Sequence, residues 1–73
     1  MILDRFERVV RAQFPLGKAL SLDTKLKDLG ADRVDVTVTV LNLEVEFGRE
    51  YPPARWKKAR TLGDLLQMVE ELL

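Results

Sequence analysis

The apolar residues near the N-terminus recur every three or four positions, which predicts an amphipathic helix. Arg5, Arg8 and Arg11 fall outside this apolar stripe. We expect the helix to end near Pro15 and Gly17, because both residues disfavour its continuation. The residues of the stripe are Ile2, Leu3, Phe6, Val9, Val10 and Phe14.

The segment TLGDLLQMVEELL predicts a second amphipathic helix at the other end of the chain. Thr61 is a suitable N-cap, and Asp64 follows three residues later, as in a capping box. Its apolar face consists of Leu62, Leu65, Leu66, Val69, Leu72 and Leu73.

Two shorter elements are expected between these helices. Pro53 suits the first position of a helix, and the run ARWKKAR that follows is long enough for one or two turns only. Before Gly30, a short turn carries Leu26 and Leu29, with Asp23 or Thr24 as its cap.

The segment Val34–Val40 alternates apolar and polar residues, as an amphipathic strand does. A lone strand among helices would leave its backbone groups without partners. A helix instead has Asp32 as N-cap, Asp35 at the third position and Gly48 at its end. The four valines and two threonines oppose it by about 2 to 4 kcal/mol, which tertiary packing has to override. We therefore predict a helix over Val34–Phe47.

Composition indicates one small soluble domain over residues 1–73. A chain of this size buries about 60% of the surface of its unfolded form, so its core must be simple and continuous. Apolar residues make up 47% of the sequence and charged residues 33%, which leaves no neutral run long enough to cross a membrane. No signal-peptide pattern is present, so we expect a cytoplasmic protein without membrane contact.

The residue types that are absent exclude most catalytic chemistry. The sequence has no histidine and no cysteine, and therefore lacks the usual general base, thiol nucleophile and transition-metal ligands. Its one serine, Ser21, has no base beside it. We expect neither an enzyme nor a metal site. Net charge is zero and the basic run RWKKAR is short, so we expect no nucleic-acid partner.

Three motifs together resemble the acyl carrier protein family: DLGADRVD, then LEVEFGREYP, then KKARTLGDLLQMV. The resemblance covers residues 24–69 without a gap. It implies an all-α four-helix bundle of acyl-carrier-protein type with a short third helix, in which Val34–Phe47 is the long second helix. Members of the family carry acyl chains in pathways such as fatty-acid or polyketide biosynthesis.

The chain departs from the family at Arg33, which is flanked by Asp32, Val34 and Asp35. The family has a serine at this place, and its hydroxyl carries a 4'-phosphopantetheine arm. Arginine has no hydroxyl, and Thr37 lies a full turn further along the helix. We therefore expect no prosthetic group on this chain.

Two interpretations of Arg33 remain open. It is either a solvated residue at a site that has lost its task, natural or substituted to prevent modification, or it pairs with a carboxylate or phosphate of this chain or of a partner.

The resemblance also implies that the second helix presents carboxylates to partner enzymes. Asp35, Glu44 and Glu46 retain part of that acidic face, whereas valines stand at other positions where polar residues are expected. Some of these valines should be exposed, either as isolated surface residues or in contact with a protein partner or a second copy. The expected docking residues are Arg33, Val36, Val38, Glu44 and Val45.

Trp56 and Ala59 exchange the small and large residues that the family has on its third helix beside the acyl cavity. Trp56 either turns inward and plugs that cavity or lies over the surface as a lid. We expect it to be mostly buried against one core cluster. That cluster is expected to contain Leu3, Phe6, Val10, Phe14, Leu26, Leu29, Val34, Val40, Leu41, Phe47, Leu62, Leu65, Leu66 and Val69.

The function expected from these features is that of an acyl-carrier-protein-like module that docks to proteins, such as acyl-transfer or other biosynthetic enzymes. An acyl carrier protein in an unmodifiable or unusual form is the alternative. A third reading is a binding protein for an anionic ligand or nucleic acid through Arg33 and RWKKAR.

Overall fold

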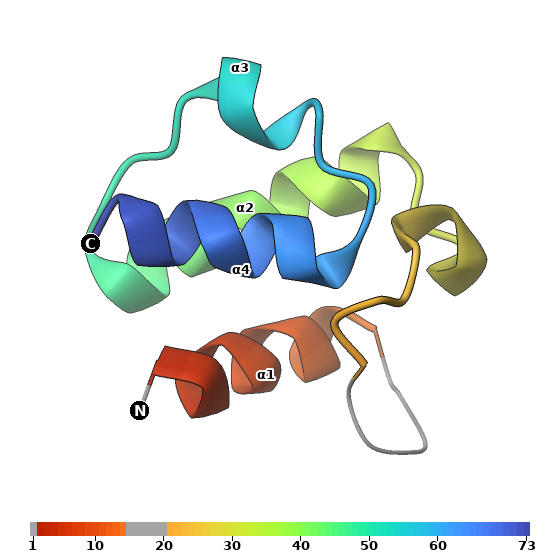
Figure 1. Ribbon diagram of the computed structural model, residues 1–73, viewed down its shortest axis with the longest axis horizontal. Helices are drawn as coiled ribbons and strands as arrows, with labels where there is room; N and C mark the ends of the chain where they lie inside the picture. The colour runs from red at the N-terminus through yellow and green to blue at the C-terminus, as the bar shows by residue number, and fades with distance from the viewer. Residues whose placement is uncertain (1, 15–20) are drawn as a thin grey trace.

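The computed structural model describes residues 2–14 and 21–73, and within them the fold is all-α (Figure 1). These residues contain no strand, and only an isolated antiparallel bridge joins Lys25 to Thr61. The helices are α1 (Ile2–Gln13), the 3₁₀ helix η1 (Leu26–Leu29), α2 (Arg33–Phe47), α3 (Pro53–Trp56) and α4 (Leu62–Glu71). The expected four helices with a short third one are thus confirmed.

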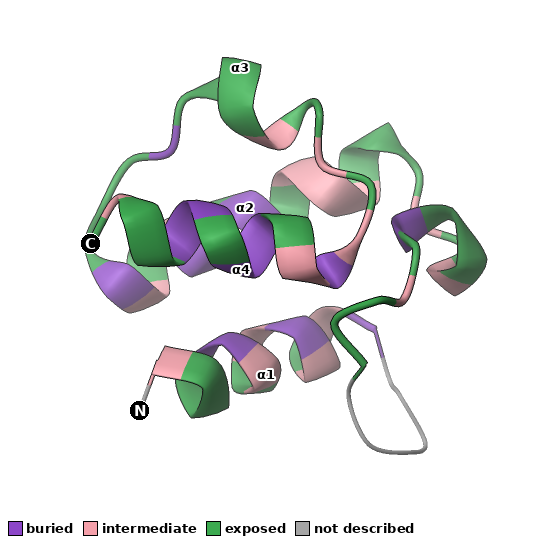
Figure 2. Ribbon diagram, viewed as in Figure 1, coloured by how far each residue is buried: buried purple, intermediate pink, exposed green. Residues whose placement is uncertain are grey.

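Helix α1 packs against α2 and α4, and the short α3 packs against α4. Buried residues lie on the sides of α1, α2 and α4 that face one another (Figure 2). The core consists of Phe6, Val10, Phe14, Leu26, Val40, Leu43, Phe47, Tyr51, Leu62, Leu65, Leu66, Met68 and Val69, together with the buried Thr39.

Three residues that the sequence placed in this core are exposed, and those predictions were wrong: Leu3 at 43%, Val34 at 67% and Leu41 at 54%. The inward line of α1 repeats every four residues through Phe6 and Val10, and Leu3 lies to one side of it. Val34 and Leu41 lie on the side of α2 that faces away from the core.

Helix α2 forms despite its valines, as predicted. Asp32 is the N-cap, and its side chain accepts a hydrogen bond from the Asp35 backbone nitrogen at 2.9 Å. The Asp35 carboxylate accepts one in return from the Asp32 backbone nitrogen at 3.1 Å. At the other end, Gly48 adopts φ 65°, a left-handed conformation that favours glycine. Local caps therefore fix both ends of the helix.

Helix α4 begins with the predicted capping box of Thr61 and Asp64.

The remaining predictions about helix ends were not confirmed in the same way. Helix α1 ends at Gln13, while Pro15 and Gly17 lie outside the described residues. Lys25 is the N-cap of η1 and makes no side-chain cap bond, so the cap expected from Asp23 or Thr24 was wrong. Leu73, expected on the apolar face of the last helix, follows α4 and is 46% exposed.

Backbone hydrogen bonds fasten the loop before η1 to the start of α4. The backbone nitrogen of Leu26 donates to the carbonyl of Arg60 at 2.8 Å, and that of Leu62 donates to Thr24 at 3.1 Å. The nitrogen of Gly63 donates to Leu22 at 2.8 Å, and a Cβ at this glycine would lie only 2.9 Å from the same carbonyl oxygen. We call this set of bonds the clasp.

None of the helices within residues 2–14 and 21–73 has the length and apolar character needed to cross a membrane.

Candidate functional site

Arg33 is the first residue of α2, and its side chain is exposed. The carboxylates of Asp32 and Asp35 accept the capping-box hydrogen bonds, and the structure records no ion pair between Arg33 and any of residues 2–14 and 21–73. The Thr37 hydroxyl donates to the Arg33 carbonyl at 2.9 Å. This bond fixes the Arg33 backbone only, so the exposed guanidinium has its charge available on the surface.

A hollow of about 320 Å³ lies beside Arg33, between α2 and the residues that follow α3. Val36, Trp56 and Ala59 supply apolar walls, while Arg33 and Lys57 supply two positive charges. Val36, which the sequence placed on the docking surface, is partly buried and packs against the core.

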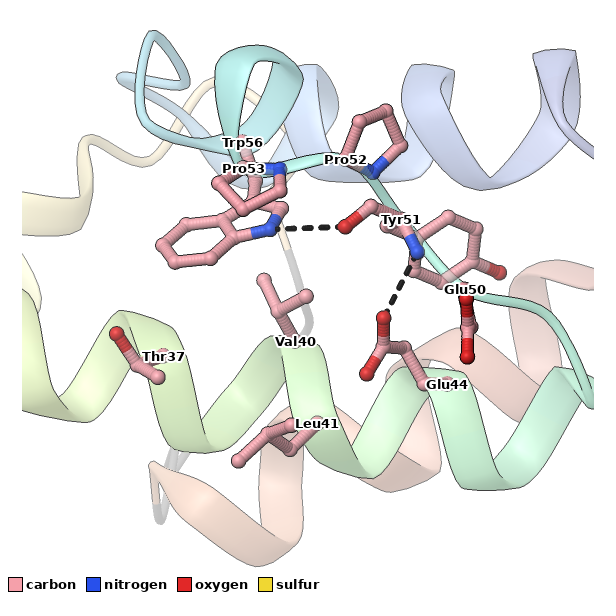
Figure 3. Close-up of a pocket in the computed structure, with 9 residues that line it drawn as sticks. All are labelled: Thr37, Val40, Leu41, Glu44, Glu50, Tyr51, Pro52, Pro53 and Trp56. Carbon is pink, nitrogen blue, oxygen red and sulfur yellow. Dashed lines mark hydrogen bonds between the residues drawn. The ribbon is translucent and has the colours of Figure 1, made fainter.

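Trp56 also borders a second hollow of about 500 Å³, lined by residues of α2 and by the segment that leads into α3 (Figure 3). The indole nitrogen of Trp56 donates to the Tyr51 carbonyl at 3.2 Å, and the Tyr51 nitrogen donates to the Glu44 carboxylate at 2.8 Å. Trp56 is partly buried and packs against the core, so it is less buried than the sequence led us to expect. Its ring lines both hollows rather than closing them.

Tyr51 is a core residue that sequence reasoning missed. It is 3% exposed, and its hydroxyl makes no hydrogen bond with the described residues. Burial raises the pKa of this phenol above its ordinary value, and the negative charge of Glu44 raises it further, against opposing effects of Arg49 and Arg5. The only available signal was the Pro-Pro pair that follows, which favours an extended backbone at Tyr51.

The three carboxylates retained on α2 all have structural partners. Asp35 belongs to the capping box, and Glu44 accepts the bond from the Tyr51 nitrogen. Glu46 pairs with Arg5 of α1, with 2.7 Å between the Arg5 Nε and a carboxylate oxygen. The Arg5 guanidinium also lies 4.6 Å from the centre of the Phe47 ring, in a cation–π contact. Each of these three carboxylates therefore makes a contact within the fold.

Four aliphatic residues of α2 instead face outward. We call them the outer stripe: Val34 is 67% exposed, Val38 37%, Leu41 54% and Val45 84%. The sequence placed Val38 and Val45 on this surface, but placed Val34 and Leu41 inside. Exposed apolar residues in a row, unlike scattered ones, are typical of a contact surface.

The basic run RWKKAR begins in α3 at Arg55 and continues beyond the end of that helix. Arg55 pairs with Glu71, and this hydrogen bond lowers the pKa of the Glu71 carboxyl, with a smaller contribution from Gln67. Lys57, like Arg33, borders the smaller hollow.

Within the described residues, no group of three acidic side chains has the geometry to hold a metal ion. A scan of the sequence against protein-family models finds no matching family.

Proposed function

We propose that this protein is an acyl-carrier-protein-like module that docks to other proteins without carrying a covalent phosphopantetheine arm. The proposal rests on the sequence resemblance, and the order of elements agrees with it: a long, capped α2 followed by a short α3. The observation that carries the proposal is Arg33, exposed at the first position of α2, where the resemblance expects the serine.

The other hydroxyl groups of α2 are poor substitutes for that serine. The Thr37 hydroxyl donates to the Arg33 carbonyl, and the buried Thr39 hydroxyl donates to the Asp35 carbonyl at 2.8 Å. Ser21 lies in the loop before η1. An attachment reaction needs an accessible hydroxyl at the helix end, and Arg33 provides none.

Docking would use the outer stripe of α2 with Arg33 at its end. Because Glu44 and Glu46 already have partners, apolar contact contributes more here than the acidic contacts that the resemblance implies. We propose acyl-transfer or other biosynthetic enzymes, of the fatty-acid or polyketide type, as the class of partner.

Incubation with a phosphopantetheinyl transferase and coenzyme A, followed by mass spectrometry, tests this function. The native chain should keep its mass, and so should Arg33→Ala. Arg33→Ser should gain one phosphopantetheine group.

A gain of that mass by the native chain would overturn the proposal and support the alternative, an unusual form of genuine carrier. If Arg33→Ser stays unmodified although it is folded, the transferase does not recognise this helix, because the free carboxylates that the resemblance implies are missing as well. The proposal that the native chain carries no arm stands in that case.

A further inference from the structure

Helix α2 carries two apolar stripes on opposite sides. Both use the same spacing of four, three and four residues, and at about 100° per residue their centres lie roughly 160° apart. The inner stripe, which meets the core, consists of Val36, Val40, Leu43 and Phe47. The outer stripe consists of Val34, Val38, Leu41 and Val45.

The outer stripe has the form of a helix-packing surface. Its four residues follow one line over about 17 Å of the helix, and this spacing lets side chains of a second helix fit between them. A shallow hollow of about 370 Å³ beside Leu41 and Val45 offers room for such a side chain. No element among the described residues covers the stripe, since its residues are 37 to 84% exposed.

The charges beside the stripe distinguish between orientations of a second helix. Arg33 and Glu44 lie on the same flank of the stripe, towards opposite ends of α2. In a parallel pair of α2 helices about a twofold axis, Arg33 of one copy and Glu44 of the other lie at different levels and on opposite flanks of the contact, so they do not meet. In an antiparallel pair, each Arg33 lies within about 3 Å, measured along the axis, of the level of Glu44 in the other copy. The helix dipoles also favour the antiparallel arrangement.

We propose that α2 pairs with α2 of a second copy of this chain, antiparallel and about a twofold axis. Val34 of one copy then lies opposite Val45 of the other, and Val38 lies opposite Leu41. Arg33 approaches Glu44 of the other copy twice, once on each side of the axis, because the bond from the Tyr51 nitrogen uses only one of the two Glu44 carboxylate oxygens. The surface is thus complementary to itself in both apolar spacing and charge.

Two further features bear on this choice of partner. The chain has a net charge of zero, so two copies do not repel one another over long range. The stripe is short, so the pair buries less surface than a standard interface and should be weak and dependent on concentration. The pairing uses the same stripe as the proposed docking. The pairing does not depend on whether the chain carries an arm. Mass spectrometry therefore tests the proposed function alone, and the two experiments below test the pairing alone.

Cross-linking tests the arrangement directly, because the chain has no cysteine of its own. Val34→Cys and Val45→Cys variants are mixed at high concentration under mild oxidation. The disulfide between position 34 and position 45 should form several-fold faster than 34–34 or 45–45. Ala12→Cys on the exposed side of α1 reports the rate of random collision. Faster 34–34 and 45–45 bonds, or equal rates for all variants including Ala12→Cys, would overturn the proposal.

Analytical ultracentrifugation gives a second test without modification. The average mass of the native chain should rise with concentration towards that of a dimer. Val45→Lys and Arg33→Glu should each weaken association at least tenfold, whereas Ala12→Lys should leave it unchanged, with circular dichroism confirming that each variant is folded. A native chain that remains monomeric up to about 1 mM would overturn the pairing, since a specific surface is measurable at that concentration.

Discussion

The indole nitrogen of Trp56 lies 3.2 Å from the backbone carbonyl oxygen of Tyr51 and donates a hydrogen bond to it. The bond joins α3 to the segment that leaves α2. The Tyr51 nitrogen in turn bonds to Glu44 of α2, so a continuous chain of bonds runs from the short helix to the long one (Figure 3).

Trp56→Ala should lower the free energy of unfolding by about 2 to 3 kcal/mol, less than removal of a fully buried aromatic, because the ring is partly exposed. Trp56→Phe should cost less, since it keeps most of the apolar contact and loses the hydrogen bond. Urea unfolding measures both. Native fluorescence should be quenched by iodide more slowly than that of free indole, and equal quenching would contradict the observed packing.

Leu41 and Leu43 offer a matched comparison on one helix. Leu43 is fully buried and Leu41 is 54% exposed. Leu43→Ala should therefore destabilise the fold by about 2 to 5 kcal/mol, and Leu41→Ala by less than about 1 kcal/mol. Urea unfolding at low protein concentration measures both without a contribution from pairing. Similar losses for the two variants would show that α2 presents a different side to the core.

Helix α2 also shows what the sequence could and could not predict. The ends of α2 were predictable because Asp32 and Asp35 bond to backbone atoms within three residues, which is local information. The side that faces the core was not, because the inner and outer stripes have equal spacing and comparable apolar character. Only packing against the rest of the core distinguishes them, so Leu41 was assigned to the inside and Val36 to the outside.

The candidate site was predictable to a similar extent. Exposure of Arg33 follows from its place at a helix end. The ion pair between Arg5 and Glu46 joins residues 41 positions apart, and no local sequence pattern predicts it.

Tyr51→Phe should raise the free energy of unfolding by about 1 kcal/mol, because it removes a buried hydroxyl without a partner among the described residues. The raised pKa of the Tyr51 phenol in the folded protein also predicts how the free energy of unfolding depends on pH. The unfolded chain loses this proton first, near the ordinary value of 10.0, so stability should fall as the pH rises above it. Chemical unfolding from pH 9 to 11 should show a smaller fall for Tyr51→Phe. A fall of equal size would exclude Tyr51 as its source.

Asp64 should make the fold sensitive to acid. Hydrogen bonds from the backbone nitrogens of Arg60 and Thr61 hold the pKa of this carboxyl below its ordinary value of 3.8. The unfolded chain therefore binds the proton first as the pH falls, and the stabilisation present above pH 3.8 is lost below it.

Asp64→Asn should reduce this dependence, measured by urea unfolding between pH 2.5 and 5. Asp64→Ala should cost about 1 kcal/mol at neutral pH, as for the loss of a helix cap. Asp28→Asn, at an exposed residue of η1, is the control. If both Asn variants behave alike, the capping carboxylate of α4 does not cause the acid sensitivity.

The clasp between the loop before η1 and the start of α4 has a consequence for the order of folding. Its bonds join residues more than thirty positions apart, so they close a loop that contains α2 and α3. Closing such a loop costs chain entropy, and the bonds repay that cost only after the enclosed helices have docked. The clasp should therefore form late. The amide hydrogens of Leu26, Leu62 and Gly63 would then exchange with solvent when the whole loop opens, whereas those at the end of α4 exchange by local fraying.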